Sequence, residues 1–290
     1  MKHGLIACAL LSTAIPFAGC HISGGQECLA PGGIVFPHKW VGQIDRSKFN
    51  EPSGIVYHPI RGTLFVVGDE GDLCEMTGKG VLVKKKLSDR RGPAGQRPDY
   101  EGITCDPATG LLYVAVEGQE TIIEVDPETF ETKRTFRLER VLNGKTLMKK
   151  GGQGIEGITF VPDPQHPEGG TFYVAHQSFT LENPGEVSGI LEVELPLRTA
   201  SHDDPRGKTL RCFSLGVIDL SGLHYDKATD RVYVISDATN TLWEITRQGR
   251  IVRRYAFPGD SQEGIAVDPG GYVYIAQDSG GILKIEWLRR

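Results

Sequence analysis

One short phrase recurs along this chain: a Glu or Ser, then a Gly, then an Ile or Leu. Its copies begin at Ser53, Glu101, Glu156, Ser221 and Glu263, so successive copies are 48, 55, 65 and 42 residues apart. A fixed internal pattern at variable spacing indicates one supersecondary unit that is repeated with loop insertions.

Each copy of the phrase opens a series of short runs with the alternating apolar residues of β-strands. In the second copy these runs are 101–105, 111–116, 121–126 and 132–138, and Asp-Pro and Thr-Gly pairs separate them. Such pairs are typical of tight turns between strands. Four antiparallel strands that repeat around an axis make a β-propeller. We therefore predict an all-β, five-bladed β-propeller.

The last repeat lacks a fourth strand, because the chain ends soon after the run 282–287. The segment 36–44 resembles fourth strands such as 81–87, and it precedes the first copy of the phrase. We expect this N-terminal strand to complete the last blade, which closes the ring and removes exposed sheet edges. The alternative is six blades, with the sixth hidden in residues 139–152 or 179–207, both of which read as loops.

The first twenty residues have the pattern of a secretory signal. Lys2 and His3 precede an apolar run, and Phe17-Ala18-Gly19-Cys20 resembles the lipobox of bacterial lipoproteins, whose cysteine carries the lipid. We predict a lipoprotein signal peptide over 1–19, a lipid-anchored tether over 20–33 and a single propeller domain over 34–290. The alternative is an ordinary signal peptide that is cleaved nearby.

The predicted location is the bacterial cell envelope, with the lipid on Cys20 holding the protein to a bilayer. Residue 21 is His and not Asp, which favours an outer-membrane lipoprotein that faces the periplasm if the host has two membranes. Removal of residues 1–19 leaves 31 basic and 37 acidic side chains, a net charge of −6. This charge argues against nucleic acid as a partner.

Four cysteines remain once Cys8 is cleaved away and Cys20 is lipidated: Cys28, Cys74, Cys105 and Cys212. An oxidising envelope compartment permits disulfides, and four cysteines allow three pairings. The alternative is that these cysteines are buried thiols within strands. The chain has no Cys-x-x-Cys pair, so a zinc or redox motif is not expected.

The repeated phrase also predicts a site. The start of each first strand and the end of each second strand meet at one mouth of a propeller channel. This arrangement gathers acidic side chains there, with Asp99 and Asp219 nearby as further oxygen donors. The predicted metal ligands are Glu101, Glu156, Glu263, Asp69, Glu117, Asp237 and Asp278.

Several carboxylates in one small mouth cannot all stay ionised without a bound cation, basic partners or protonation. Oxygen ligands suit a hard cation, so Ca²⁺ is the expected cofactor. The competing interpretation is structural. In it the Gly permits close packing at the axis, the Ile fills the core, and the Glu accepts backbone N–H groups from a neighbouring blade.

Two long basic loops, 88–100 and 143–154, are expected at the same mouth. They carry Arg90, Arg91, Arg97, Lys149 and Lys150, and His176 lies near the acidic rings. We predict that these six residues bind a small anionic ligand. The alternative is that the basic loops only neutralise the acids or are solvated. Ser53 and Ser221 lack a Gly-x-Ser-x-Gly elbow, so a serine hydrolase is not expected.

Phrases along residues 36–288 resemble the SdiA-regulated family of secreted bacterial β-propellers. They include Glu101-Gly-Ile-Thr, Ile218-Asp-Leu-Ser-Gly-Leu and Gln262-Glu-Gly-Ile-Ala-Val-Asp-Pro-Gly-Gly-Tyr-Val-Tyr. The segment Gly152-Gln-Gly-Ile-Glu-Gly-Ile is similar to a motif of the "esterase-like activity of phytase" family. Phytase-like and gluconolactonase-like propellers imply calcium in the channel and hydrolysis of phosphoesters or lactones. The mixed Glu and Ser ring, without the His and Asn typical of gluconolactonase sites, argues against a lactonase.

Two functions remain open from the sequence. The first is a phytase-like or esterase-like hydrolase that depends on a divalent cation at the channel mouth. The second is a non-catalytic propeller that binds an envelope ligand or protein, with structural ions. Fold alone does not choose between them.

Overall fold

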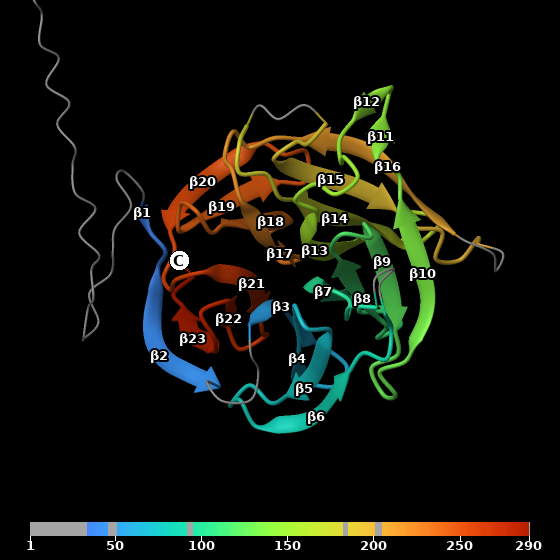
Figure 1. Ribbon diagram of the computed structural model, residues 1–290. Helices are drawn as coiled ribbons and strands as arrows, with labels where there is room; N and C mark the ends of the chain where they lie inside the picture. Colours follow the sequence, from blue (N-terminus) through green and yellow to red (C-terminus); the bar gives the residue numbers. More distant parts are fainter. Residues whose placement is uncertain (1–33, 46–50, 92–94, 182–184, 201–204, 290) are drawn as a thin grey trace, which may run out of the picture.

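The computed structural model describes residues 34–45, 51–91, 95–181, 185–200 and 205–289, and in these ranges the chain forms strands and no helix. The strands are arranged around a central axis as a β-propeller (Figure 1). Within the described ranges, no helix of the length and apolarity needed to cross a membrane occurs. Residues 1–33, which include Cys20, Cys28, the predicted signal and the tether, lie outside the described residues.

The strands are arranged in four-stranded antiparallel units. The first unit is β3 (Pro52–His58), β4 (Thr63–Gly68), β5 (Asp72–Met76) and β6 (Leu82–Leu87). The second is β7 (Tyr100–Cys105), β8 (Leu112–Val116), β9 (Thr121–Val125) and β10 (Thr132–Leu138). The third is β13 (Ile155–Pro162), β14 (Gly170–His176), β15 (Gly189–Glu194) and β16 (Arg206–Phe213).

The remaining units follow the same order. The fourth is β17 (Leu220–Asp226), β18 (Arg231–Ser236), β19 (Thr241–Thr246) and β20 (Ile251–Ala256). The fifth is β21 (Gln262–Val267), β22 (Tyr272–Gln277) and β23 (Ile282–Trp287), with β2 (His38–Asp45) as its fourth strand. β2 pairs antiparallel with β23, as predicted, so the two ends of the described chain share one unit.

The innermost strand of each unit contacts the innermost strands of both neighbours, in the order β3, β7, β13, β17, β21 and back to β3. Between each pair of adjacent units lies one cluster of buried apolar side chains. The β-branched and aromatic residues of the second strands supply much of this core, since they pack well on a pleated surface that is covered on both sides. This packing holds the strand ends at the channel mouth in place.

Two further segments extend the outer strands. β1 (Ile34–Val35) pairs in parallel with the end of β20, and the start of β16 pairs in parallel with the end of β10. The second pairing joins two units into one eight-stranded sheet.

Residues 139–152 and 179–207 were expected to be loops, and the structure differs in part. The first range contains a small hairpin, β11 (Val141–Leu142) with β12 (Lys145–Thr146). The second contains β15, the third strand of its unit. The interpretation of 179–207 as a loop was therefore wrong for 189–194, because long flanking segments conceal a short buried strand.

Four aspartates stabilise the turns between strands. Asp106 and Asp226 each accept a hydrogen bond from the backbone N–H two residues later, at 2.8 and 3.0 Å. Asp126 accepts one from the N–H of Glu128 at 2.8 Å. Asp268 accepts one from Tyr272 at 2.9 Å. Such side-chain turns stabilise the reversals between strands.

The three described cysteines lie on separate strands: Cys74 on β5, Cys105 on β7 and Cys212 on β16. No disulfide links these three residues to one another. Cys74 and Cys105 are buried, and burial raises the pKa of the Cys105 thiol to about 12. Buried thiols therefore describe Cys74 and Cys105, Cys212 is half-buried, and any pairing with Cys28 lies outside the described residues.

Candidate functional site

Each copy of the repeated phrase forms a β-bulge at the start of an innermost strand. In β7, Tyr100 pairs with β8 and the next paired residue is Ile103, so Glu101 and Gly102 fall outside the ladder. The same shift occurs in β13 and β17, and in β3 and β21 a shorter shift leaves only Ser53 and Glu263 outside the ladder. A bulge bends its strand and re-aims the side chain it displaces. The Ser or Glu of each phrase is thereby separated from the regular sheet.

The backbone just before the phrase is also unusual. Four of the five residues that lie two positions before it have positive φ: Glu51 at 50°, Gly154 at 92°, Asp219 at 58° and Ser261 at 46°. L-residues adopt this left-handed region sparingly, and such residues gather where the surrounding structure enforces a local geometry.

The Gly of each phrase is required by a close approach at the axis. A Cβ on Gly102 would lie 2.4 Å from the carbonyl oxygen of Glu156. The relation repeats around the ring, from Gly54 to Glu101, from Gly157 to Ser221, from Gly222 to Glu263 and from Gly264 to Ser53, with distances of 1.9 to 3.1 Å. The structural interpretation of this Gly is therefore correct. The interpretation leaves the adjacent Glu side chains unexplained.

Three carboxylates from the first two units come together at the channel mouth. Asp69, Asp99 and Glu101 can each place one oxygen within 4.8 Å of the other two. Asp69 follows β4, and Asp99 and Glu101 flank the start of β7. Ser53 donates a hydrogen bond to Asp69 that orients this carboxylate. Among the described residues, this is the group whose ligand atoms are close enough to hold one metal ion.

Two more glutamates adjoin this group. Glu101 is hydrogen-bonded to the buried Glu156, and Glu117 is hydrogen-bonded to Asp99. A carboxylate can donate to another only when one of the two carries a proton. Burial and the neighbouring carboxylates raise the pKa values of Glu101 and Glu156, and the same causes raise the pKa of Glu117 to about 8.

A second acidic group surrounds Glu263. Burial, with Asp237, Asp219 and Asp278 close by, raises the pKa of Glu263 to about 8. Asp237 accepts a hydrogen bond from the N–H of Gln262 at 2.8 Å. Asp219 accepts from the amide of Gln177 at 2.8 Å and from the N–H of Ala238 at 2.9 Å. These aspartates bond to neighbouring backbone and amide groups, a role that the structural interpretation had given to the glutamates.

The structure adds one acid that the sequence analysis missed. Asp260 accepts a hydrogen bond from the side chain of Gln277 at 2.6 Å, and its charge also raises the pKa of Asp237. Asp99, which had been expected only as an auxiliary oxygen donor, belongs to the closest carboxylate group. Both residues precede a copy of the phrase by two or three positions, and that offset is the signal that could have identified Asp260.

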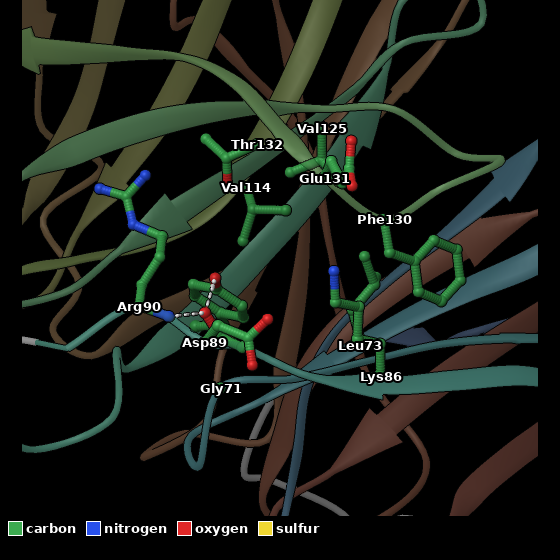
Figure 2. A pocket seen from close by; sticks show the side chains of 12 residues that line it. Gly71, Leu73, Lys86, Asp89, Arg90, Val114, Val125, Phe130, Glu131 and Thr132 are labelled. Carbon is green, nitrogen blue, oxygen red and sulfur yellow. Dashed lines mark hydrogen bonds between the residues drawn. The ribbon is translucent and has the colours of Figure 1, made fainter.

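Two of the predicted basic ligands, Arg90 and Lys149, bind partners outside the acidic group. Arg90 donates to the hydroxyl of Thr135 at 3.0 Å and lines a separate cavity between the first two units (Figure 2). Lys149 forms an ion pair with Glu186 at 3.2 Å. Arg91, Arg97 and Lys150 are exposed. The pKa values of the carboxyl groups at the mouth are accordingly raised by burial and by other carboxylates.

His176 is 1% exposed at the end of β14, and its Nδ1 lies 2.8 Å from the carbonyl oxygen of Val187. Burial lowers its pKa, so the ring is neutral at pH 7. Ser221 donates to the carbonyl oxygen of Gln262 at 2.7 Å, a structural bond between adjacent innermost strands.

With this geometry established, comparison with known proteins identifies the family. The model of the SdiA-regulated family matches residues 42–279, most of the chain. The chain belongs to the SdiA-regulated family. A search of curated proteins gave no match.

Two solved structures resemble this member of the SdiA-regulated family. The first is glutaminyl cyclase from Myxococcus xanthus, with a TM-score of 0.52, 15% identity, and coverage of 88% of this chain and 97% of that one. The second is streptogramin B lyase, with a TM-score of 0.42, 13% identity, and coverage of 81% and 64%. At this identity the first likeness supports the fold alone.

Proposed function

We propose that the channel mouth binds a divalent cation, Ca²⁺ in the first instance, through Asp69, Asp99 and Glu101. The observation that carries the proposal is the approach of these three carboxylates to within 4.8 Å. Carboxylate oxygens are the ligands that Ca²⁺ takes in proteins, and Ca²⁺ accepts six to eight oxygens. Three protein carboxylates leave coordination positions for water or a ligand.

The alternatives to a cation are less favourable at this group. Lys149 and Arg90 are engaged elsewhere, so they do not balance the charge. Protonation relieves the charge repulsion within the Glu101–Glu156 pair, because one proton shared by the two carboxyl groups removes one of the two negative charges. A bound cation would balance the charge of Asp69, whose pKa is raised by burial and by the charges of Asp99 and Asp278.

The second part of the proposal is a metal-dependent hydrolase of an ester. Glu117 supports it, because this carboxyl is hydrogen-bonded to Asp99 and has a pKa of about 8 without a cation, which the charge of a bound cation would lower toward the working pH. A general base is most effective when its pKa lies near the working pH. A cation held by Asp69, Asp99 and Glu101 would lower the pKa of a bound water, and Glu117 would accept its proton.

The positions of the basic side chains limit how the site could bind a negatively charged substrate. Arg90 and Lys149 are committed to other partners, so a phosphoester would depend on the exposed Arg91, Arg97 or Lys150. The alternative function is a non-catalytic propeller that binds an envelope ligand or protein around a structural ion. The solved structure of a glutaminyl cyclase with this fold is consistent with an enzyme and does not decide the chemistry.

The first experiment is thermal unfolding of the chelator-treated protein, with and without Ca²⁺. At a hundred times the dissociation constant, Ca²⁺ should stabilise the fold by about 2.7 kcal/mol. The shift should disappear in Asp99→Asn and persist in Asp278→Asn, an exposed residue of the second acidic group. No shift with Ca²⁺, Mg²⁺ or Mn²⁺ contradicts the cation site.

A screen of ester and phosphoester substrates then separates the two functions. A hydrolase should lose turnover in Glu117→Gln while keeping its Ca²⁺-dependent stabilisation, because Glu117 accepts a proton and is not in the closest ligand group. Ca²⁺ binding without any turnover would favour the binding protein.

We also propose that the protein is a lipoprotein of the outer membrane, with lipid on Cys20. The support is the lipobox-like Phe17-Ala18-Gly19-Cys20 and the His that follows it. Intact mass of the mature protein from its native envelope tests the proposal, since Cys20→Ser should abolish the lipid. An unmodified wild-type N-terminus would contradict it.

A further inference from the structure

The central channel opens into a second cavity at the end opposite the acidic side chains, and we name this cavity the far mouth. Its volume is about 570 Å³. Its wall is formed by residues toward the ends of all five innermost strands, which surround the axis in Figure 1, and by four of the turns that follow them. The Ser or Glu of each repeated phrase lies at the start of the same strands. Neither the proposed cation site nor the proposed hydrolysis therefore involves the far mouth.

Apolar side chains form much of this wall. The third residue of every copy of the repeated phrase contributes to it, and these residues are Ile55, Ile103, Ile158, Leu223 and Ile265. Two residues farther along their strands, Tyr57, Phe160 and Tyr225 add aromatic rings. Small-molecule sites in proteins are usually cavities of about 300–1,000 Å³ with mainly apolar walls and a few polar groups. The far mouth has the size and the wall of such a site.

Three polar residues of the wall occupy equivalent positions in successive units. Thr104, Thr159 and His224 are equivalent because each pairs with a tyrosine of the second strand in its unit. The hydroxyl oxygen of Thr104 accepts a hydrogen bond from the N–H of Phe160 at 3.0 Å, and that of Thr159 accepts one from the N–H of Tyr225 at 3.0 Å. These two hydroxyl groups therefore connect one innermost strand to the next.

His224 differs from the two threonines. Its imidazole forms no hydrogen bond with another residue in the described part of the chain. Burial lowers the pKa of His224 to about 4, and the charges of Asp226 and Arg289 act on it in opposite directions. The ring is therefore neutral at pH 7 and offers one N–H donor and one nitrogen acceptor. Because polar groups inside proteins usually have hydrogen-bond partners, this ring is the polar group that a ligand in the far mouth would meet.

The charges of the wall favour a neutral ligand. Its charged side chains are two acids and two bases: Asp226, Asp268, Lys227 and Arg289. Arg289 forms an ion pair with Asp226 at 3.0 Å, and Asp268 accepts a hydrogen bond from the hydroxyl of Tyr274 at 2.8 Å. Lys227 is exposed. The formal charges of the wall cancel, so electrostatic attraction selects neither an anion nor a cation.

We propose that the far mouth binds one small neutral aromatic molecule, whose hydroxyl or amine group forms a hydrogen bond with the imidazole of His224. The branched aliphatic side chains of the wall would bury the apolar body of the ligand, and the tyrosine and phenylalanine rings would pack against it. The burial supplies most of the affinity. The imidazole favours ligands with one polar group over plain hydrocarbons, because only the former give it a partner.

The first probe is N-phenyl-1-naphthylamine, a neutral aromatic amine whose fluorescence rises in apolar surroundings. Titrated into the full chain, it should give a saturable signal that corresponds to one site per chain. Val56→Trp should abolish this signal, because Val56 is a half-buried residue of the wall and the larger side chain would fill the cavity. His166→Phe changes a histidine that lies outside the wall and pairs with Glu194, so this matched control should bind the probe normally.

Competition against the bound probe tests the role of His224. In the wild type, 1-naphthol should displace the probe at a concentration about two- to tenfold lower than naphthalene does, the range expected for one net hydrogen bond. This preference should vanish in His224→Phe, which keeps an aromatic ring at the position and removes both nitrogens. Melting temperatures close to that of the wild type would show that the variants are folded.

The contrary results are distinct. No saturable signal in the wild type would overturn the proposal. A signal that the folded Val56→Trp variant leaves unchanged would mean that the probe binds elsewhere, which also overturns it. Equal displacement by 1-naphthol and naphthalene in the wild type, or a preference for 1-naphthol that survives in His224→Phe, would overturn the hydrogen bond assigned to His224.

Discussion

At the scale of single residues, carboxyl groups are the unusual feature of this propeller. The pKa values of Glu117 and Glu263 are both raised to about 8, with burial as the largest cause. A raised pKa in the folded state means that the folded chain holds protons that the unfolded chain has released. The free energy of unfolding therefore falls as pH rises from about 4.5 to about 8 in the absence of a cation.

Glu263→Gln tests this electrostatic cost. In chelator at pH 8.5 the variant should be more stable than the wild type by about 1–3 kcal/mol, the usual penalty for an unfavourably buried polar group. The difference should close toward pH 4.5, where Glu263 is protonated in the folded state and the unfolded state begins to bind protons. Urea unfolding at the two pH values gives the comparison. Glu70→Gln is the exposed control, and an equal gain there would assign the effect to net charge instead.

At the scale of elements, the bulge of each innermost strand joins architecture and site. It lets a Gly pack against the next strand's carbonyl and separates the neighbouring Glu or Ser from the ladder. Paired outer-strand ends then close the gaps between units at β20 and β10. The same geometry that seals the ring therefore also creates the acidic mouth.

Gly102→Ala tests the axial packing. The new Cβ would lie 2.4 Å from the carbonyl oxygen of Glu156, and backbone atoms cannot swing aside as a flexible side chain can. Overpacking of this kind costs about 1–3 kcal/mol and sometimes more. Gly270→Ala, whose nearest contact is a side-chain oxygen at 3.1 Å, should have a smaller effect in thermal unfolding. Equal losses in both variants would contradict the role given to the ring of glycines.

At the scale of the whole molecule, stability depends on the N-terminal segment. β2 completes the fifth unit, and Phe36 packs in the cluster between the fourth and fifth units. This segment connects elements that are more than 200 residues apart in the sequence, as the pairing of Trp40 with Ile285 shows. Its release would expose the edge of β23 and part of the core.

Phe36→Ala should lower the free energy of unfolding by about 3–5 kcal/mol, the range for truncating a buried aromatic side chain. Trp40→Ala in the same segment should have a much smaller effect, because Trp40 is 56% exposed while Phe36 is 1% exposed. Urea unfolding of the two variants provides the measurement. A Phe36→Ala variant as stable as Trp40→Ala would show that the N-terminal segment does not hold the ring together.

The sequence by itself determined the propeller class, the start of each unit, the closing strand and the turn aspartates. These features depend on local patterns of alternation, Gly placement and turn chemistry, which leave their mark on neighbouring residues. The sequence analysis did not predict the short strand β15, because long segments surround it.

Only the tertiary structure decided which acidic side chains lie close together and where the basic side chains lie. The approach of Asp99 to Asp69 joins a loop of the second unit to a strand end of the first, and sequence spacing does not encode that distance. The positions of Arg90 and Lys149 depend on Thr135 and Glu186, partners on other segments. The covering of strand edges by β1 and β16 is likewise a property of the assembled ring, since it joins segments that are far apart in the sequence.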